Sequence, residues 1–218
     1  MKIKVTYKDH MGNDLTVVNA ARVSFAKETQ WADHDSETNQ YVLKDKDRKL
    51  IHYLAEHKHL SPFGHCFASF VVKAPIFVAR QLVKHKFLRW NEISRRYVDS
   101  EPEFYEPDVW RGRAEDKKQG SDGVAHVYMD QELQWHRQLQ SYKSLLESGV
   151  CPEQARMILP QSTMTEFRWS GSLDAFAAMC NLRCAGDTQY ETRLVANRIC
   201  NSMKGLFPVS WFALRLEK

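Results

Sequence analysis

The order of strand-like and helix-like segments constrains the fold of this chain more than any other feature. Alternating apolar and polar residues predict strands at 2–7, 66–73 and 163–169. Helical spacing and capping residues predict helices at about 14–21, 50–57, 75–87, 127–148, 172–183 and 187–205. Strands and helices do not alternate as strictly as a doubly wound parallel sheet requires. The order therefore predicts an α+β fold in which an antiparallel β-sheet packs against long α-helices.

Residues that begin or end helices support these boundaries. The candidate N-caps are Asn13 or Asp14, Ser172 and Asp187. Pro75 suits the first turn of a helix, where its missing N–H group has no partner to lose. Gly149 and Gly205 are placed to end the helices that precede them. Two polar stretches, 28–46 and 111–123, are predicted to be loops, and the first could form a lid.

Length and hydropathy indicate one domain outside any membrane. A chain of 218 residues can bury one substantial core and is short for two, so we expect a single domain over 1–218. The longest apolar run, near Pro75 to Ala79, is far below the roughly 20 residues that a spanning helix needs. The N-terminus has no apolar signal segment. We therefore expect no membrane association and a cytoplasmic location.

The cysteines indicate neither a disulfide framework nor a metal site. They number five, and no two of them form a C-x-x-C pair. This pattern fits a reducing compartment. Cys180 and Cys184, four apart on a predicted helix, could share a metal, but no second ligand pair accompanies them. We interpret them as core residues and expect no metal.

Positive charge is concentrated in one short segment. Between Lys84 and Arg96 there are five cations and one anion, so this segment carries the whole net charge of +4. A solvated helix face is the ordinary explanation of an isolated charged run. On an otherwise neutral protein, however, a concentrated positive patch also attracts partners that carry phosphate.

Aromatic residues within the basic segment raise a second possibility. Phe87, Trp90 and Tyr97 lie among the cations, as they would on a surface that stacks the bases of single-stranded nucleic acid. Against this interpretation, Glu92 lies inside the patch, the net charge is low, and no RNA-recognition signature occurs. We therefore expect no nucleic-acid partner.

The basic segment also carries a family resemblance. It reads KHKFLRWNEISRRY and resembles the signature of flavin-dependent thymidylate synthases, which is Arg-His-Arg, seven residues, Ser, with an Asn-Glu-x-Ser-x-Arg-Tyr tail. Seven residues separate Lys86 from Ser94, as that signature requires. The segments MGNDLTVVNAARVSF, HLSPFGH, KAPIFVARQ, SGVCPEQARMILP and NLR are similar to the same family. The resemblance covers most of 11–97 and 145–200, and it implies an α+β fold.

The resemblance implies two sets of binding residues. The positions that match the dUMP site of the family are Gln81, Lys84, Glu92, Ser94, Arg95, Arg96, Arg156 and Arg183. Those that match its FAD site are His59, Ser61, Lys84, His85, Lys86, Glu92 and Ser172. Independently of the resemblance, Ser94, Arg96 and Arg156 could bind a nucleotide phosphate through charge-assisted hydrogen bonds. Arg183 is the predicted catalytic residue, because a permanent cation beside uracil stabilises the negative charge that builds up on the ring.

The resemblance also implies a reaction and an assembly. Methylenetetrahydrofolate would supply the one-carbon unit, and FAD reduced by NADPH would supply the hydride that completes methylation of dUMP. No G-x-G-x-x-G loop is present, so we expect no Rossmann site for NADPH. Family members are homotetramers with shared active sites, and we therefore expect 84–96 and Arg183 to meet across an interface.

Three departures from the family pattern keep a related activity open. Lys84 and Lys86 replace the usual arginines, which keeps the charge but loses the bidentate geometry. The stretch 184–189 replaces a common Asp-Ser-His-Ala-Gln and lacks its histidine, and Ala178 replaces a common asparagine. The alternative is transfer of a hydroxymethyl group to the pyrimidine nucleotide without net reduction by NADPH.

Overall fold

The computed structural model describes residues 2–37, 40–115 and 120–215 and is built around one four-stranded sheet. The strands, in the spatial order β1-β4-β8-β5, are β1 (Lys4–Met11), β4 (Phe67–Pro75), β8 (Met164–Ser172) and β5 (Leu88–Glu92). All neighbouring strands pair antiparallel. The α+β architecture predicted from the sequence is confirmed. The structure adds β5, which lies inside the basic segment and was not predicted.

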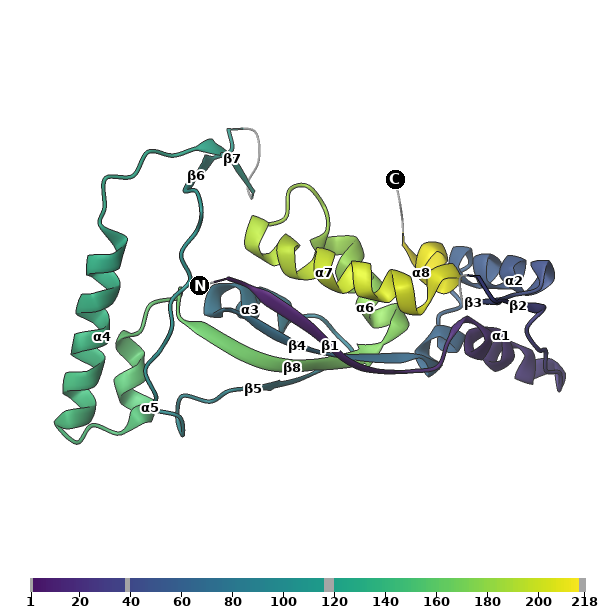
Figure 1. Cartoon of the computed structure of the whole chain (residues 1–218), viewed down its shortest axis with the longest axis horizontal. Helices are drawn as coiled ribbons and strands as arrows, with labels where there is room; N and C mark the ends of the chain where they lie inside the picture. The colour runs from purple at the N-terminus through teal and green to yellow at the C-terminus, as the bar shows by residue number, and fades with distance from the viewer. Residues whose placement is uncertain (1, 38–39, 116–119, 216–218) are drawn as a thin grey trace.

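Helices cover one face of this sheet. They are α3 (Ile76–Leu82), α6 (Leu173–Arg183), α7 (Tyr190–Leu206) and α8 (Pro208–Leu214) (Figure 1). Burial alternates along β4 and β8, as expected for a sheet with one covered face. Phe176 of α6 meets Phe70 and Trp169 edge to face, at ring-centroid distances of 5.4 and 5.6 Å. These rings fix α6, and with it the side chains of its last turn, relative to the sheet.

The remaining helices lie at the two ends of the sheet. At one end are α1 (Asp14–Arg22) and α2 (Asp45–Glu56), and at the other are α4 (Gln131–Glu147) and α5 (Pro152–Ala155) (Figure 1). Of the two predicted N-caps, Asn13 rather than Asp14 caps α1, and it does so through a capping box. The buried carboxylate of Asp14 accepts hydrogen bonds from the backbone N–H groups of Val209 and Ser210, at 2.9 and 2.8 Å, and so joins α1 to α8. No helix in the described part of the chain is both long and apolar enough to cross a membrane.

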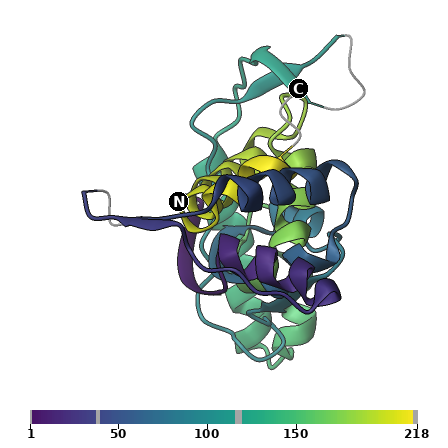
Figure 2. The same cartoon turned by 90° about the vertical axis from the view of Figure 1, so that its right-hand side faces the viewer.

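Both predicted loops contain short hairpins. Strands β2 (Asp33–Asp35) and β3 (Gln40–Val42) pair within the first loop and project from the body of the molecule (Figure 2). Strands β6 (Arg111–Arg113) and β7 (Ser121–Val124) pair within the second. Residues 38–39 and 116–119 lie outside the described residues. The prediction of irregular loops was therefore wrong for these strands. They are only three or four residues long, which is too short to give a periodic signal in the sequence.

Several helix boundaries differ from the sequence prediction. Pro75 is the N-cap of α3 rather than part of its first turn, and the helix ends at Leu82 instead of about Phe87. The chain reverses at Phe87, which has a φ of 64°, because β5 must turn back to pair with β8. Helix α7 runs from Tyr190 to Leu206, whereas we predicted a cap at Asp187 and an end at Gly205. Helix α4 begins at Gln131, a few residues later than predicted.

The pairing of β5 with β8 requires a glycine at position 171. Gly171 lies opposite Leu88, and a Cβ atom there would be 2.4 Å from Leu88 Cδ2 and 3.0 Å from the Phe87 carbonyl oxygen. We expect Gly171→Ala to lower the free energy of unfolding by about 1–3 kcal/mol, measured by urea denaturation, since the Leu88 side chain and the backbone at Phe87 would both have to shift. Gly205→Ala is the matched control, because a Cβ atom at Gly205 would meet open space. Equal effects of the two substitutions would contradict the steric explanation.

Candidate active site

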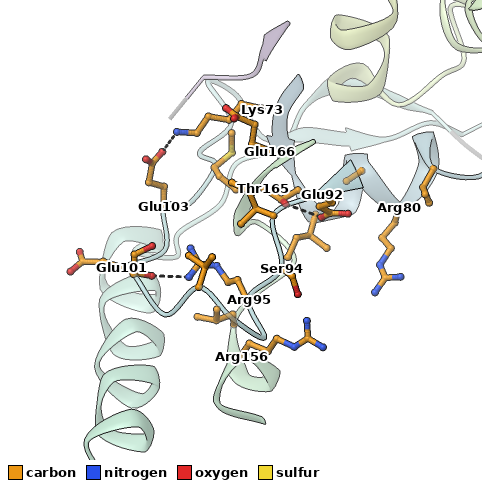
Figure 3. Close-up of a pocket in the computed structure, with 18 residues that line it drawn as sticks. Lys73, Arg80, Glu92, Ser94, Arg95, Glu101, Glu103, Arg156, Thr165 and Glu166 are labelled. Carbon is orange, nitrogen blue, oxygen red and sulfur yellow. Dashed lines mark hydrogen bonds and ion pairs between the residues drawn. The ribbon is translucent and has the colours of Figure 1, made fainter. Parts of the chain in front are cut away.

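The first cavity, cavity 1, lies where β8 begins, between α3, the segment after β5 and the turn η3 (Arg156–Ile158) (Figure 3). Its volume is about 550 Å³. The charged residues that line it are Lys73, Arg80, Glu92, Arg95, Glu101, Glu103, Arg156 and Glu166. Ser94 also lines it. Four of the eight predicted nucleotide-binding residues (Glu92, Ser94, Arg95 and Arg156) thus share one cavity, and Arg80 is an addition that the sequence prediction did not include.

Three side chains of cavity 1 are arranged to bind an oxyanion. In Figure 3 the side chains of Arg80, Ser94 and Arg156 extend toward the same open side of the cavity. Arg156 donates through Nε to the Glu153 carbonyl oxygen at 3.2 Å, so its terminal amino groups stay available. Within the described residues, no carboxylate forms an ion pair with Arg80 or Arg156. The two guanidinium groups are not neutralised by a carboxylate of the described residues. Together with the Ser94 hydroxyl, they can therefore hold a phosphate.

The other cations of cavity 1 and the carboxylate of Glu92 already have partners. Lys73 pairs with Glu103 at 2.6 Å, and Arg95 donates to the Ser100 carbonyl oxygen at 2.7 Å. Glu92 accepts from Thr165 Oγ1 at 2.8 Å and from Trp90 Nε1 at 3.0 Å. These bonds fix the wall of the cavity and leave Arg80 and Arg156 as its open cationic donors.

The position of Trp90 also bears on the nucleic-acid alternative. The Trp90 ring stacks on the buried Phe167 ring at a centroid distance of 3.6 Å and an interplanar angle of 19°. One face of Trp90 is therefore covered by the protein's own core. Of the three aromatic residues in the segment, only Phe87 and Tyr97 are highly exposed. The geometry does not provide the continuous stacking platform that this alternative needs.

The second cavity, cavity 2, lies beside the last turn of α6, the start of α7 and the β6–β7 hairpin. Its volume is about 660 Å³. Three predicted nucleotide-binding residues, Gln81, Lys84 and Arg183, line it. The predicted helix over 75–87 would place Arg80 and Lys84, which are four residues apart, on one face. Because α3 ends at Leu82, Arg80 instead lines cavity 1 and Lys84 lines cavity 2.

A hydrogen-bond network holds the floor of cavity 2. Gln81 donates to Gln189 Oε1 and accepts from Thr192 Oγ1 at 3.0 Å. The buried carboxylate of Glu191 accepts from Gln189 Nε2 at 3.3 Å and from Tyr105 OH at 3.4 Å. Burial, reinforced by the charge of Glu191, raises the pKa of Tyr105 to about 12, so the phenol stays protonated as a donor.

Arg111 of the β6–β7 hairpin also belongs to this network. It forms an ion pair with Glu191, and its guanidinium lies 4.3 Å from the centroid of the Tyr190 ring. The hairpin is thus attached to the start of α7. Nothing in the sequence indicates this arrangement, because 80 positions separate Arg111 from Glu191.

His85 holds the predicted catalytic residue Arg183. Arg183 Nε donates to His85 Nε2 at 3.0 Å, an arrangement that requires the imidazole to be neutral at that nitrogen. Burial, together with the positive charge of Arg183, lowers the pKa of His85 from 6.5 to about 4. His85 therefore accepts this hydrogen bond throughout the neutral range, while the terminal amino groups of Arg183 remain available to cavity 2.

The low pKa of His85 predicts a pH dependence of stability. Between pH 6.5 and about 4 the unfolded chain binds a proton at this residue that the folded chain does not, so stability is lost as the pH falls through this window. In His85→Gln this loss should be absent, because glutamine does not titrate and its carbonyl can still accept from Arg183. Urea denaturation from pH 7 to 4 should therefore bring the unfolding free energies of wild type and variant closer together or reverse their order.

A matched control separates this effect from general acid sensitivity. His136→Gln removes an exposed histidine on α4 that lines neither cavity. The wild-type pH profile in this control, together with a changed profile in His85→Gln, supports the assignment. Identical profiles in both variants would contradict it.

The other predicted site residues lie elsewhere. Arg96 donates to Ser94 Oγ at 3.4 Å and packs on Tyr97, at the edge of cavity 1. Lys86 is exposed and lines neither cavity. His59, Ser61 and Ser172 lie near the opposite end of the sheet, since Ser172 pairs with Phe67 whereas Met164, beside cavity 1, pairs with Pro75. A single chain therefore divides the predicted nucleotide residues between two cavities and separates them from part of the predicted flavin set.

Comparison with known proteins identifies relatives along almost the whole chain. The sequence model of a family described as thymidylate synthase complementing protein matches residues 7–209. A flavin-dependent thymidylate synthase of Thermus thermophilus is 40% identical over 211 residues, which are 94% of this chain and 73% of that protein. A flavin-dependent thymidylate synthase of Thermosipho africanus is 37% identical over 206 residues, which are 92% of this chain and 85% of that protein.

The fold is similar to that of a solved nucleotide-modifying enzyme. The crystal structure is of the UMP/dUMP methylase PolB from Streptomyces cacaoi bound with 5-Br dUMP. Its TM-score is 0.77 at 30% sequence identity, and the match covers 97% of this chain and 94% of that one. A second structure, of the same methylase bound with 5-Br UMP, matches with the same score and identity.

Proposed function

Because this chain belongs to the thymidylate synthase complementing protein family, we propose that it converts dUMP to dTMP by reductive methylation of the uracil ring. It is an enzyme of the methyltransferase class, with relatives named as flavin-dependent thymidylate synthases. The proposed one-carbon donor is methylenetetrahydrofolate, and the proposed source of hydride is FAD reduced by NADPH. One observation carries the proposal. Cavity 1 presents two arginines, Arg80 and Arg156, that form no ion pair with a carboxylate of the described residues, and a third arginine, Arg183, lines cavity 2.

The phosphate of dUMP is assigned to cavity 1. Arg80, Ser94 and Arg156 supply its donors, and Arg96 beside Ser94 adds positive charge. Charge-assisted hydrogen bonds of this kind fix orientation as well as affinity. The pyrimidine base is assigned to Arg183, with Gln81 and Lys84 beside it in cavity 2. Arg183 would stabilise negative charge on the ring as carbon 5 becomes nucleophilic.

This assignment requires more than one copy of the chain. In a single chain the phosphate donors and Arg183 line different cavities. A homotetramer in which cavity 1 of one copy faces cavity 2 of another would unite them. Mixing tests this directly: Arg156→Gln and Arg183→Gln, each expected to be inactive alone, should recover activity when they are co-refolded. A monomer by light scattering, or no recovery on mixing, would contradict the shared site.

The predicted flavin residues fit the cofactor by donor chemistry. His59, Ser61, Lys84 and Lys86 are exposed donors, of the kind that a dinucleotide pyrophosphate attracts. The flavin, when bound, supplies the hydride for the reductive step. These residues and Ser172 also lie at separate places in one chain, so the proposed FAD site needs the same assembly. The protein's contribution is to hold the two ring systems in contact and exclude water.

Identification of the product tests the proposed reaction. The protein is incubated anaerobically with FAD, NADPH, methylenetetrahydrofolate and dUMP, with UMP in a parallel reaction, and the nucleotides are identified by mass spectrometry. The expected product is dTMP, with formation that depends on each component. A 5-hydroxymethyl nucleotide formed without NADPH would replace methylation by the hydroxymethylase alternative, and unchanged nucleotide with bound FAD would remove the activity.

A further inference from the structure

Three cysteines that the proposed reaction does not use come together behind the last turn of α6. Cys180 and Cys184 belong to α6 and its C-cap, and Cys200 belongs to α7. Each of these three thiols shifts the pKa of the other two through side-chain hydrogen bonding. Cys180 is fully buried and donates to the Ala196 carbonyl oxygen at 3.6 Å, whereas Cys184 and Cys200 are partly exposed.

Two donors surround the sulfur of Cys200. Trp211 of α8 donates its indole N–H to Cys200 Sγ at 3.4 Å. Arg215, just after α8, places its positive charge near both Cys184 and Cys200. The Nη1 atom of Arg215 is buried and has no hydrogen-bond partner in the described structure. A buried cationic donor without an acceptor is costly, and a thiolate beside it would remove that cost.

These contacts distinguish Cys200 from an ordinary core cysteine. Hydrogen bonds from Cys180 and Cys184, followed by the Trp211 N–H and the charge of Arg215, lower the pKa of Cys200 despite its partial burial. Cys66 shows the contrary case, since burial and the nearby Asp14 raise its pKa to about 12. The expectation that Cys180 packs in the core is confirmed by its burial, but packing alone does not explain the donors around Cys200. In the described part of the chain, no group of three or more His, Cys, Asp or Glu side chains is arranged to hold a metal ion.

We propose that Cys200 is a peroxide-reactive thiolate site, with Cys184 as the thiol that resolves its oxidised form. The Cys200 sulfur attacks one oxygen of a hydroperoxide; an S–O bond forms, the O–O bond breaks, and the leaving oxygen departs as water or alcohol after it gains a proton. Cys184 then attacks the sulfenic sulfur; an S–S bond forms, the S–O bond breaks, and water leaves. The two thiols lose two electrons in total, and the hydroperoxide gains them.

Cys184 is assigned as the resolving thiol because it is partly exposed and lies at a helix end. Cys180 is buried in the interior of α6, where sulfenic acid and solvent have less access. A bond between Cys184 and Cys200 would tie the end of α6 to α7 directly beside Arg183. Oxidation should therefore also reduce turnover, but this consequence alone rests on the proposed function. The chemistry at the thiols is tested without any assay of activity.

Alkylation kinetics test the reactive thiolate in the assembled protein. The reduced full chain is treated with iodoacetamide from pH 6 to 8, and each cysteine is quantified by peptide mass spectrometry. Cys151, exposed at the N-cap of α5 and far in sequence from the cluster, is the internal control. The alkylation rate of Cys200 should be nearly constant over this range, whereas that of a thiol with a pKa of about 8.5 rises roughly tenfold per pH unit. In Arg215→Gln the Cys200 rate at pH 6 should fall several-fold. A Cys200 profile parallel to that of Cys151 would overturn the proposal.

Peroxide treatment tests the second step. Wild-type protein should lose two hydrogen atoms in mass and give a linked pair of peptides containing Cys184 and Cys200, and a dithiol should reverse both changes. Cys184→Ser should retain a sulfenic acid on Cys200 that dimedone traps, while Cys200→Ser should form neither product and Cys151→Ser should behave as wild type. Circular dichroism confirms that the variants are folded. Peroxide products that form equally in Cys200→Ser, or none in folded wild type, would overturn the proposal.

Discussion

Replacing Arg183 with glutamine should lower kcat about 100- to 1000-fold while the protein stays folded, because one preorganised donor to developing charge is typically worth this much. Arg183 lies in the last turn of α6 and lines cavity 2. The core rings that hold α6 on the sheet do not involve it, so its loss should leave the fold intact. The measurement is steady-state turnover of dUMP with near-UV circular dichroism as the folding check.

The division between kcat and KM shows what Arg183 does. If it acts mainly as the reaction proceeds, kcat and kcat/KM should fall together, whereas a purely binding role would raise KM alone. Arg183→Lys should recover only part of the lost rate. It keeps the positive charge but cannot reproduce the hydrogen bond that Arg183 Nε donates to His85. Arg48→Gln, which removes an exposed arginine on α2 that lines neither cavity, is the control and should leave turnover unchanged. Wild-type kcat in Arg183→Gln would remove the catalytic role.

Sequence periodicity was sufficient for the elements whose apolar face repeats at one period. The N-cap at Asn13 (predicted as Asn13 or Asp14), the strands around Phe70 and Trp169, and the helix that ends at Arg183 were all predicted near their observed positions. These elements have an apolar face that repeats at one period, and the caps involve neighbours in sequence. The α+β class followed from their order.

Periodicity failed where long-range pairing decides the local structure. Residues 83–87 have helical spacing, but the chain leaves the helix there because β5 pairs with β8 across about 80 positions of sequence. This one error placed Lys84 on the same face as Arg80 and concealed the division into two cavities. Glu191 was missed for a similar reason. A lone carboxylate near a helix start resembles a surface charge, and only the folded chain brings Arg111 and Tyr105 to it.

The Glu191 network also gives the largest expected effect on stability. Its carboxylate is 3% exposed and pairs with Arg111, so Glu191→Ala leaves a partly buried guanidinium without its counter-charge and Gln189 and Tyr105 without their acceptor. Truncating one partner of such a pair costs about 3–5 kcal/mol, and the 25% exposure of the Arg111 side chain places the expected loss near the lower end, about 3 kcal/mol by urea denaturation.

A double-mutant cycle separates the ion pair from the rest of the network. Arg111→Met removes the charge that Glu191→Ala would leave unpaired, so the double variant should be more stable than the sum of the two single effects predicts. Both single variants should also weaken whatever cavity 2 binds, since the hairpin loses its attachment to α7. Strict additivity would mean that Arg111 and Glu191 are not coupled in solution. In that case the hairpin would have to be held over cavity 2 by contacts other than this pair.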